Sequence, residues 1–247
     1  MNKIAIIIPS RLEAKRLPGK PLKIIKNKEM ILHVYEAAKA SNAGEVYVAS
    51  PNEKIIELIK DYGGNAIKTS EKHQTGTDRV FEVFKDTLKS KPNIIINLQG
   101  DMPNINPKSI SSLANYMMEN KCDICTLASD LDKDKDKDDP NIVKVILKEK
   151  LTKDRFVEAT DFNRNYDKSK NYTYHHVGIY AFSSQALSKY VSFKRSKLEI
   201  DRKLEQLRAL ENGMTIHVGH ISSSPLSIDT EEDLIEIKKL MEKNEKK

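Results

Sequence analysis

Apolar segments of strand length alternate with segments of helical periodicity along the first hundred residues. Apolar runs predict strands over residues 3–9, 45–50 and 93–103, with a further strand at 65–70. Apolar residues at helical spacing predict helices over 30–41, 53–63 and 77–88. This alternation is typical of βαβ units, and strands that are apolar throughout are typically buried on both faces. The sequence therefore predicts an α/β fold around a parallel sheet.

The second half of the chain continues with less regular spacing. Strands are predicted over 122–129, 141–147, 175–182 and 214–221, with a helix over 199–213 and a helical C-terminus. The charge run at 132–139 predicts a solvated loop. No internal repeat or Pro/Gly/Ser-rich linker marks a domain boundary, so 1–247 is read as a single domain.

Composition excludes several classes of protein. The formal net charge is +6, but aromatic residues are sparse and no basic helix stands out, which favours a lysine-rich surface over a nucleic-acid interface. Apolar runs are too short for a signal sequence or a membrane span, so we expect a soluble, cytoplasmic protein. Cys122 and Cys125 lack further ligands at zinc-site spacing and are expected to be ordinary packed thiols.

Charged residues collect where the predicted strands end, which is where open parallel sheets bind ligands. The first strand is followed by Arg11, Arg16 and Lys20, and the 93–103 strand ends in Asp101. The segment H-Q-T-G-T-D-R, residues 73–79, precedes a predicted helix whose free N–H groups favour anions. Cations beside a single carboxylate indicate a polyphosphate with Mg²⁺, which binds one or two carboxylates together with phosphate oxygens. The usual phosphate-loop and dinucleotide motifs are absent.

Seven motifs in order resemble one family of sugar nucleotidyltransferases: IIPSR…RLPGKPL, HQTGTDR, NLQGDMP, PNIVKV, HHVGIYAF, KLEQLRAL and IDTEEDL. The chain is identified as similar to 3-deoxy-manno-octulosonate cytidylyltransferase (CMP-Kdo synthetase). The resemblance implies transfer of the cytidylyl group of CTP to Kdo, with Mg²⁺ as cofactor and lipopolysaccharide assembly as the use of the product. It also implies a Rossmann-like nucleotidyltransferase fold with a mixed, mostly parallel sheet. Approximately residues 125–195 would contribute a dimerisation and sugar-side subdomain of a homodimer.

The resemblance assigns roles residue by residue. It implies that Asp101 and Asp229 bind the metal and, with Lys20, form the catalytic set. The implied nucleotide-binding residues are Pro9, Arg11, Arg16, Lys20, His73, Gly76 and Thr77. The implied sugar-binding residues are Arg79, Gln99, Arg164, His176, Tyr180, Glu205 and Gln206. Independently, cations around a triphosphate stabilise the negative charge that moves onto departing pyrophosphate.

Structural readings stay open for several of these residues. Asp229 or Thr230 could cap a C-terminal helix, and Glu205 and Gln206 could be exposed on an amphipathic helix. Adjacent strand residues face opposite ways, so only one of His175 and His176 can enter a pocket. Three cations stay possible partners of the sugar carboxylate: Arg79, Arg164 and the metal.

Other functions also stay open. A cytidylyltransferase for sialic acid or for 8-amino-Kdo would use the same chemistry, and a non-catalytic anion-binding or nucleic-acid-binding protein would use only the basic surface.

Overall fold

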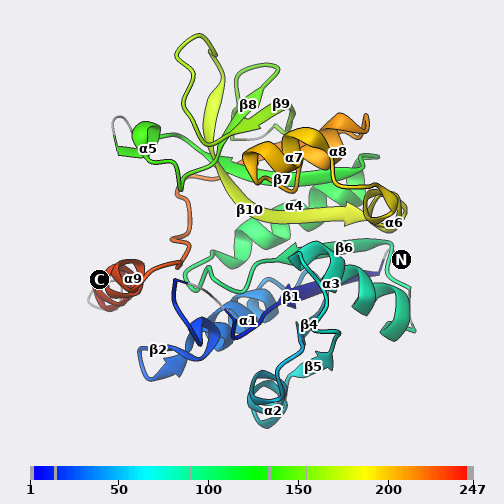
Figure 1. Ribbon diagram of the computed structural model, residues 1–247, viewed down its shortest axis with the longest axis vertical. Coiled ribbons are helices and arrows are strands. Elements are labelled where there is room, and N and C mark those ends of the chain that lie inside the picture. The colour runs from blue at the N-terminus through cyan, green and yellow to red at the C-terminus, as the bar shows by residue number, and fades with distance from the viewer. Residues whose placement is uncertain (1–2, 14–15, 90, 133–134, 154, 244–247) are drawn as a thin grey trace. The chain divides into compact units, whose positions relative to one another are not determined.

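The structure is a computed structural model that describes residues 3–13, 16–89, 91–132, 135–153 and 155–243 (Figure 1). The chain forms two compact units. Unit 1 comprises residues 1–111 and 225–247, and unit 2 comprises residues 112–224. Helix α4 (Pro107–Glu119) begins in unit 1 and ends in unit 2.

Unit 1 is built on parallel strands in the order β5-β4-β1-β6. Their bounds are Ile4–Pro9 for β1, Glu45–Ser50 for β4, Asn65–Lys68 for β5 and Ile94–Leu98 for β6. Every residue of β1 and β6 is buried, as strands covered on both faces require. A short hairpin of β2 (Ile24–Ile25) and β3 (Lys28–Glu29) forms a separate sheet.

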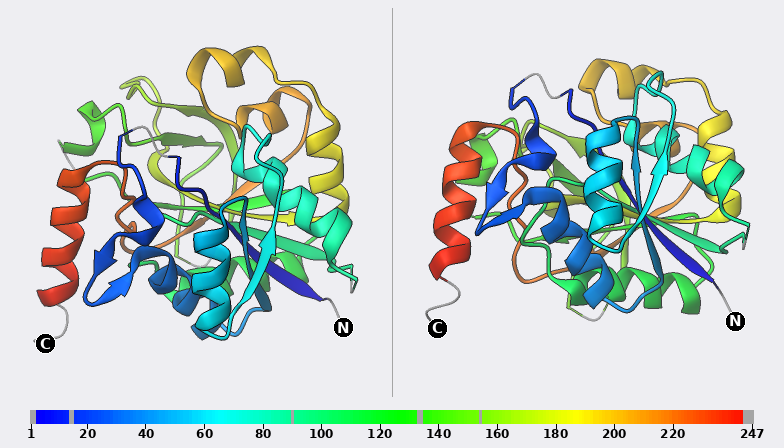
Figure 2. Two further views of the ribbon diagram at one scale, coloured as in Figure 1. Left: turned by 60° about the horizontal axis from the view of Figure 1, so that its bottom comes forward. Right: turned by 90° about the horizontal axis from the view of Figure 1, so that it is seen from below.

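Helices connect and cover these strands. They are α1 (Met30–Ala40), α2 (Glu53–Asp61), α3 (Gly76–Glu82), which continues as a π-helical turn Val83–Thr87, and α9 (Glu231–Lys243). Helix α1 packs against β4, α2 packs against β4 and β5, and α3 packs against β1, β4 and β6. Figure 2 shows α9, in red, beside the blue segment that contains the β2–β3 hairpin.

Unit 2 holds a mixed sheet in the order β10-β7-β11-β9-β8, in which β8 also pairs with β10. Only the β7–β11 pair is parallel among the strand pairs described in this unit. The strands are β7 (Ile124–Ser129), β8 (Lys144–Leu147), β9 (Val157–Asn163), β10 (Thr173–Ser183) and β11 (Ile216–His220). The helices are α5 (Lys135–Asp138), α6 (Ser184–Ser192), α7 (Lys197–Arg202) and α8 (Leu207–Glu211).

The predicted α/β class and mixed sheet are confirmed, and the predicted strands and helices of the first hundred residues lie within a few residues of the observed bounds. The prediction that the sheet is mostly parallel holds for the described pairs of unit 1 and is wrong for unit 2, where antiparallel pairs predominate among those described. Two predictions were wrong in detail. The predicted helix 199–213 is two short helices, because Lys203 takes a left-handed backbone conformation (φ 54°, ψ 47°). The predicted loop 132–139 contains α5, although its residues 133 and 134 lie outside the described part of the chain. The proposed dimerisation role of 125–195 stays a prediction.

Within the described residues, the structure contains no helix that is both long enough and apolar enough to cross a membrane.

Candidate functional site

The loop after β1 is closed by a rigid turn that presents Lys20. Gly19 has a left-handed backbone (φ 68°, ψ 16°), which glycine adopts without steric cost, and a 3-10 turn Lys20–Leu22 follows. The Gly19 amide donates to the Leu12 carbonyl oxygen at 3.1 Å, and the Lys20 amide donates to the Leu17 carbonyl oxygen at 3.1 Å. These bonds fix the backbone from which the Lys20 side chain extends.

The Lys20 ammonium group bridges the two carboxylates that the sequence assigned to the metal. Its Nζ atom donates to Asp101 Oδ2 at 2.9 Å, to Asp229 Oδ1 at 3.1 Å and to the Ile228 carbonyl oxygen at 2.7 Å. Asp101 follows β6, whereas Asp229 directly precedes the segment leading into α9. Lys20 thus contacts a carboxylate 81 positions away and another 209 positions away along the chain.

Charge dominates the environment of Lys20. Its side chain is only 15% exposed, and burial by itself lowers the pKa of an ammonium group. The carboxylates of Asp101 and Asp229 outweigh burial, so the Lys20 pKa is raised. Arg16 adds a second cation, with Nη2 2.9 Å from Asp229 Oδ2, and both partners are about half exposed. Asp229 thus has one oxygen on each cation.

Asp229 does not cap helix α9. The Thr230 hydroxyl accepts from the Asp233 amide at 3.2 Å, and Asp233 Oδ2 accepts from the amides of Asp229 and Thr230, each at 2.8 Å. The side chains of Thr230 and Asp233 therefore accept the hydrogen bonds of backbone amides at the start of α9, and together they form a reciprocal cap. The Asp229 side chain is left to the two cations, so the alternative that Asp229 serves as the cap is wrong.

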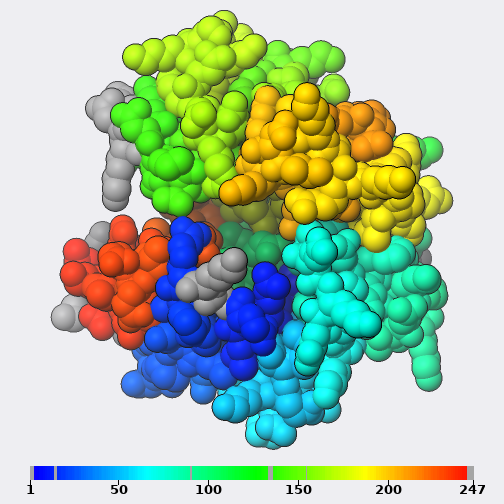
Figure 3. Space-filling model, viewed as in Figure 1, coloured from blue at the N-terminus to red at the C-terminus, as the bar shows by residue number. Residues whose placement is uncertain are grey.

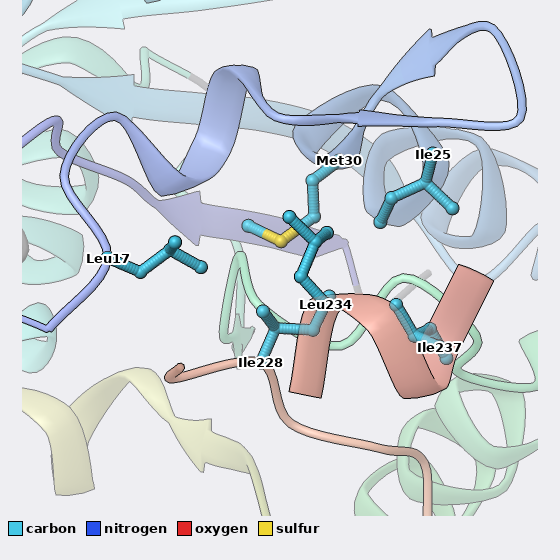
Figure 4. Packing of buried hydrophobic residues seen from close by; sticks show 6 residues of the cluster. All are labelled: Leu17, Ile25, Met30, Ile228, Leu234 and Ile237. Carbon is cyan, nitrogen blue, oxygen red and sulfur yellow. The ribbon is translucent and has the colours of Figure 1, made fainter. Parts of the chain in front are cut away.

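A hydrophobic cluster holds the two halves of this charge arrangement together. It consists of Leu17, Ile25, Met30, Ile228, Leu234 and Ile237, all at most 3% exposed (Figure 4). Leu17 precedes the Lys20 turn and Ile228 precedes Asp229, whereas Leu234 and Ile237 come from α9. Figure 3 shows the red C-terminal helix against the blue N-terminal loop at the surface. Packing of α9 therefore sets the position of Asp229 relative to Lys20.

The end of β6 carries a second polar arrangement. Gln99 Nε2 donates to Asn97 Oδ1 at 2.9 Å, and Asn97 Nδ2 donates to Thr77 Oγ1 at 3.2 Å. A Cβ atom added at Gly76 would lie 3.3 Å from Pro9 Cγ and 3.5 Å from Gln99 Oε1, so this position leaves little room for a side chain. Predicted nucleotide residues Pro9, Gly76 and Thr77 thus lie beside Gln99.

The buried guanidinium of Arg79, in α3, binds the segment that precedes this helix. Arg79 is 3% exposed, and its Nη1 donates to the Thr69 hydroxyl and, at 3.0 Å, to the Ser70 carbonyl oxygen. Burial is the larger cause, and nearby Arg11 the second, of a lowered Arg79 pKa. His73 pairs with Glu82. These contacts organise the loop, and the predicted ligand roles of His73, Arg79 and exposed Arg11 stay predictions.

In unit 2, a β-bulge in β10 arranges the predicted sugar-binding aromatic residues. The register of β10 against β7 shifts between Val177 and Tyr180. The His176 and Tyr180 rings lie 5.4 Å apart, and Thr126 Oγ1, which donates to the Ile179 carbonyl oxygen at 2.7 Å, lies 3.0 Å from His176 Nε2. Burial and then neighbouring His175 lower the pKa of His176 to about 3, so this imidazole is neutral.

His175 faces a different partner, as the alternation of strand side chains predicts. Its Nδ1 atom lies 3.2 Å from Asp136 Oδ2.

Glu205 and Gln206 lie in the turn between α7 and α8. Burial, then the Glu205 carboxylate and Tyr190, raise the pKa of Tyr180, so Glu205 lies near Tyr180. Gln206 is 8% exposed. The predicted sugar contacts of Gln206 and Tyr180 stay predictions. Gln206 is buried, so the alternative that it is exposed on a helix surface is wrong.

Arg164 follows β9 and takes part in local structure. Its Nη1 donates to the Pro140 carbonyl oxygen at 3.0 Å, and its own carbonyl oxygen accepts from the buried Lys144 ammonium group at 2.9 Å. The predicted contact of Arg164 with the sugar carboxylate stays a prediction.

Sequence reasoning missed Ser10, which follows β1. Its hydroxyl is buried and has no hydrogen-bond partner among the described residues. Such a group costs free energy unless a ligand or water satisfies it. Serine is common at the end of a strand, so no sequence pattern indicates that the hydroxyl of this serine lacks a hydrogen-bond partner.

The chemistry of the donor set fits a divalent cation. No group of three or more His, Cys, Asp or Glu side chains placed for metal binding occurs among the residues that the structure describes. Asp101 and Asp229 nevertheless converge on a positive charge, and Mg²⁺ in nucleotide sites uses one or two carboxylates with phosphate oxygens and water.

Comparison with known proteins agrees with this geometry. A profile of the cytidylyltransferase family matches residues 5–216. The 3-deoxy-manno-octulosonate cytidylyltransferase of Bartonella tribocorum is 40% identical over 238 residues, covering 96% of this chain and 97% of the relative. The protein of that name from Thermodesulfovibrio yellowstonii is 41% identical over 245 residues, covering 92% and 94%. A solved structure of CMP:2-keto-3-deoxy-manno-octonic acid synthetase complexed with CTP is 33% identical, with a TM-score of 0.89 and coverage of 98% and 99%. The chain therefore belongs to the 3-deoxy-manno-octulosonate cytidylyltransferase family.

Proposed function

We propose that this protein transfers the cytidylyl group of CTP to the anomeric hydroxyl of Kdo, giving CMP-Kdo and pyrophosphate for lipopolysaccharide synthesis. The observation that carries the proposal is the convergence of the cations Lys20 and Arg16 with the carboxylates Asp101 and Asp229, groups whose chemistry suits phosphate and a divalent metal. The relatives' shared name supports the choice of CTP and Kdo.

The reaction is a displacement at phosphorus. The anomeric oxygen forms a bond to the α-phosphorus of CTP, the bond from that phosphorus to the bridging oxygen of the β-phosphate breaks, and the hydroxyl proton leaves to solvent. Lys20 and Arg16 bind phosphate oxygens and stabilise the charge that accumulates on pyrophosphate. Both cations now lie on carboxylates, so binding of the nucleotide exchanges part of these contacts for phosphate contacts.

We propose that Asp101 and Asp229 hold Mg²⁺. When bound, this cation neutralises phosphate charge and lowers the pKa of the attacking hydroxyl. His176 is too weak a base to take the proton, because its pKa is about 3. It orients the sugar by hydrogen bonding instead, together with Tyr180, Glu205 and Gln206. Glu205 is an anion, so it accepts from sugar hydroxyls and leaves the sugar carboxylate to a cation.

Pyrophosphate release from CTP tests the proposal. We expect release that requires both Kdo and Mg²⁺ and that stops on chelation. Asp101→Asn and Asp229→Asn should each lower turnover about a hundredfold or more, because a hard cation depends on carboxylate charge. Lys23→Met is a matched control, since Lys23 is an exposed lysine of the same loop whose Nζ lies 3.7 Å from Glu231.

Sialic acid and 8-amino-Kdo serve as competing acceptors in the same assay. Faster release with either of them would reassign the substrate, and no release with any acid sugar would refute cytidylyl transfer.

We also propose a homodimer that works in the cytoplasm, where CTP is available. The resemblance to the family supports both statements. Light scattering during size-exclusion chromatography tests the first, since a mass equal to one chain at micromolar concentration would contradict it.

A further inference from the structure

The turn that carries Glu205 and Gln206 is held in an unfavourable backbone conformation. Lys203, at the end of α7, is left-handed, a region that residues other than glycine seldom adopt. The Leu204 amide donates back to the Glu199 carbonyl oxygen at 3.2 Å, and the Arg208 amide donates to the Glu205 carbonyl oxygen at 3.1 Å. Such conformations persist only where neighbouring residues enforce them, so contacts from neighbouring residues must hold this turn in place.

A buried ion pair supplies the first restraint. Glu199 is 0% exposed, and Arg208 binds it with two bonds, Nε to Oε2 at 2.8 Å and Nη2 to Oε1 at 2.7 Å. Arg195 Nε donates to Oε1 at 2.9 Å, and the Ser196 amide donates to Oε2 at 3.1 Å. Burial alone would raise the Glu199 pKa, but the bonds from the two arginines outweigh it and the pKa is lowered. Glu199 is therefore a fixed anion that ties α7 to α8.

Tyr190 supplies the second restraint and connects the ion pair to the turn. The Arg208 guanidinium lies over the Tyr190 ring, 4.7 Å from its centroid. Tyr190 is 2% exposed, and its hydroxyl donates to the Glu205 carbonyl oxygen at 2.9 Å. The Glu205 carbonyl oxygen thus accepts from both Tyr190 and the Arg208 amide. A continuous chain of contacts runs from Glu199 through Arg208 and Tyr190 to the backbone of Glu205. Figure 1 labels the helices α6, α7 and α8 that carry or flank these residues.

This framework acts on residues that face the sugar in the proposed function. The Glu205 carboxylate lies near Tyr180, whose ring lies 5.4 Å from that of His176. Rotation of the turn would move the Glu205 carboxylate and the Gln206 amide away from that pair. Directional bonds resist rotation better than apolar packing does, although an apolar replacement of a buried ion pair often costs no stability.

We propose that Tyr190 and Arg208 are positioning residues that set Glu205 and Gln206 for sugar binding, an inference that rests on the proposed function. Arg208 binds Glu199 and lies over the Tyr190 ring, and the Tyr190 hydroxyl binds the turn, so both residues can act on the turn without touching the sugar. Their effect should therefore appear in Kdo binding and be absent from CTP binding.

Tyr190→Phe tests the inference with the smallest change. The ring under Arg208 stays, and the bond from the hydroxyl to the Glu205 carbonyl oxygen is lost. We expect KM for Kdo to rise about five- to tenfold while KM for CTP changes less than twofold. Arg208→Lys is the second variant, which keeps the charge and loses the two-bond geometry, and it should shift KM for Kdo in the same direction. Arg195→Lys is the matched control, because Arg195 also binds Glu199 but is half exposed, and we expect less than a twofold effect.

A double-mutant comparison separates positioning from general loosening of the fold. In a Glu205→Ala/Gln206→Ala background, Tyr190→Phe should raise KM for Kdo less than twofold further, since the side chains it positions are gone. Unchanged Kdo kinetics in both Tyr190→Phe and Arg208→Lys, or equal rises in both KM values, would overturn the inference. Failure of the proposed function is a different result, namely no pyrophosphate release from CTP and Kdo by the unaltered protein.

Discussion

Replacing Lys20 by methionine should destabilise the ligand-free protein by about 2–3 kcal/mol. Methionine keeps most of the length of the side chain and removes the ammonium group. Breaking a buried ion pair costs about 3–5 kcal/mol, and an exposed pair contributes about 0.2–1 kcal/mol. Lys20 falls between these limits, because its own side chain is 15% exposed while Asp101 and Asp229 are 23% and 46% exposed. Water can therefore solvate part of the stranded carboxylate charge, Asp229 more than Asp101.

Chemical denaturation without nucleotide or metal measures this loss, with Lys23→Met as control. The Lys23–Glu231 pair is more exposed, at 38% and 57%, and longer, at 3.7 Å, so the control should lose less than about 1 kcal/mol. The Lys20 pKa is raised above 10.5, so its contribution is fully present below that pH and is lost only as the pH rises through the folded-state pKa. The difference from the unaltered protein should therefore be the same at pH 7 and pH 9. A loss for Lys20→Met no larger than for Lys23→Met would refute the bridging arrangement.

Three further predictions follow from burial. Leu234→Ala should cost about 2–4 kcal/mol and raise KM for CTP, because Leu234 (2% exposed) belongs to the same buried cluster as Ile228, which precedes Asp229, whereas Ile235→Ala (48% exposed) should cost less than about 0.5 kcal/mol. Between about pH 6.5 and 3 the unfolded chain binds a proton at His176 that the folded protein does not, so stability decreases as the pH is lowered, by up to about 1.4 kcal/mol per pH unit, and His176→Gln should flatten that slope in denaturation curves. Ser10→Ala should leave stability unchanged or higher, since it removes an unsatisfied buried hydroxyl, while raising KM for CTP several-fold; unaltered CTP kinetics would exclude a nucleotide contact.

The local sequence pattern was sufficient to predict those strands in which apolar residues lie on both faces. β1 and β6 are buried throughout, so their apolar runs identified them without ambiguity. Several elements that mix buried and solvent-facing residues without a clear period were not predicted. Strand β9 mixes buried residues with half-buried and exposed ones and carries Glu158 and Asp161. The helices α4 and α6 were likewise not predicted. The break between α7 and α8 could not be read from sequence either, because it depends on a left-handed lysine that is enforced by contacts from Glu199 and Tyr190.

The sequence by itself determined which chemistry the chain can support. Cations after β1, a carboxylate after β6 and the ordered motifs identified the family before any fold was known. Tertiary structure decided which of these groups act on one another. It placed Asp229 on Lys20 and Arg16, gave the helix cap to Thr230 and Asp233, and tied the Glu205 turn to Tyr190. The physical reason is range: propensity and periodicity act over a few residues, whereas Lys20 meets Asp229 only after α9 has buried its apolar face against the loop that carries Lys20.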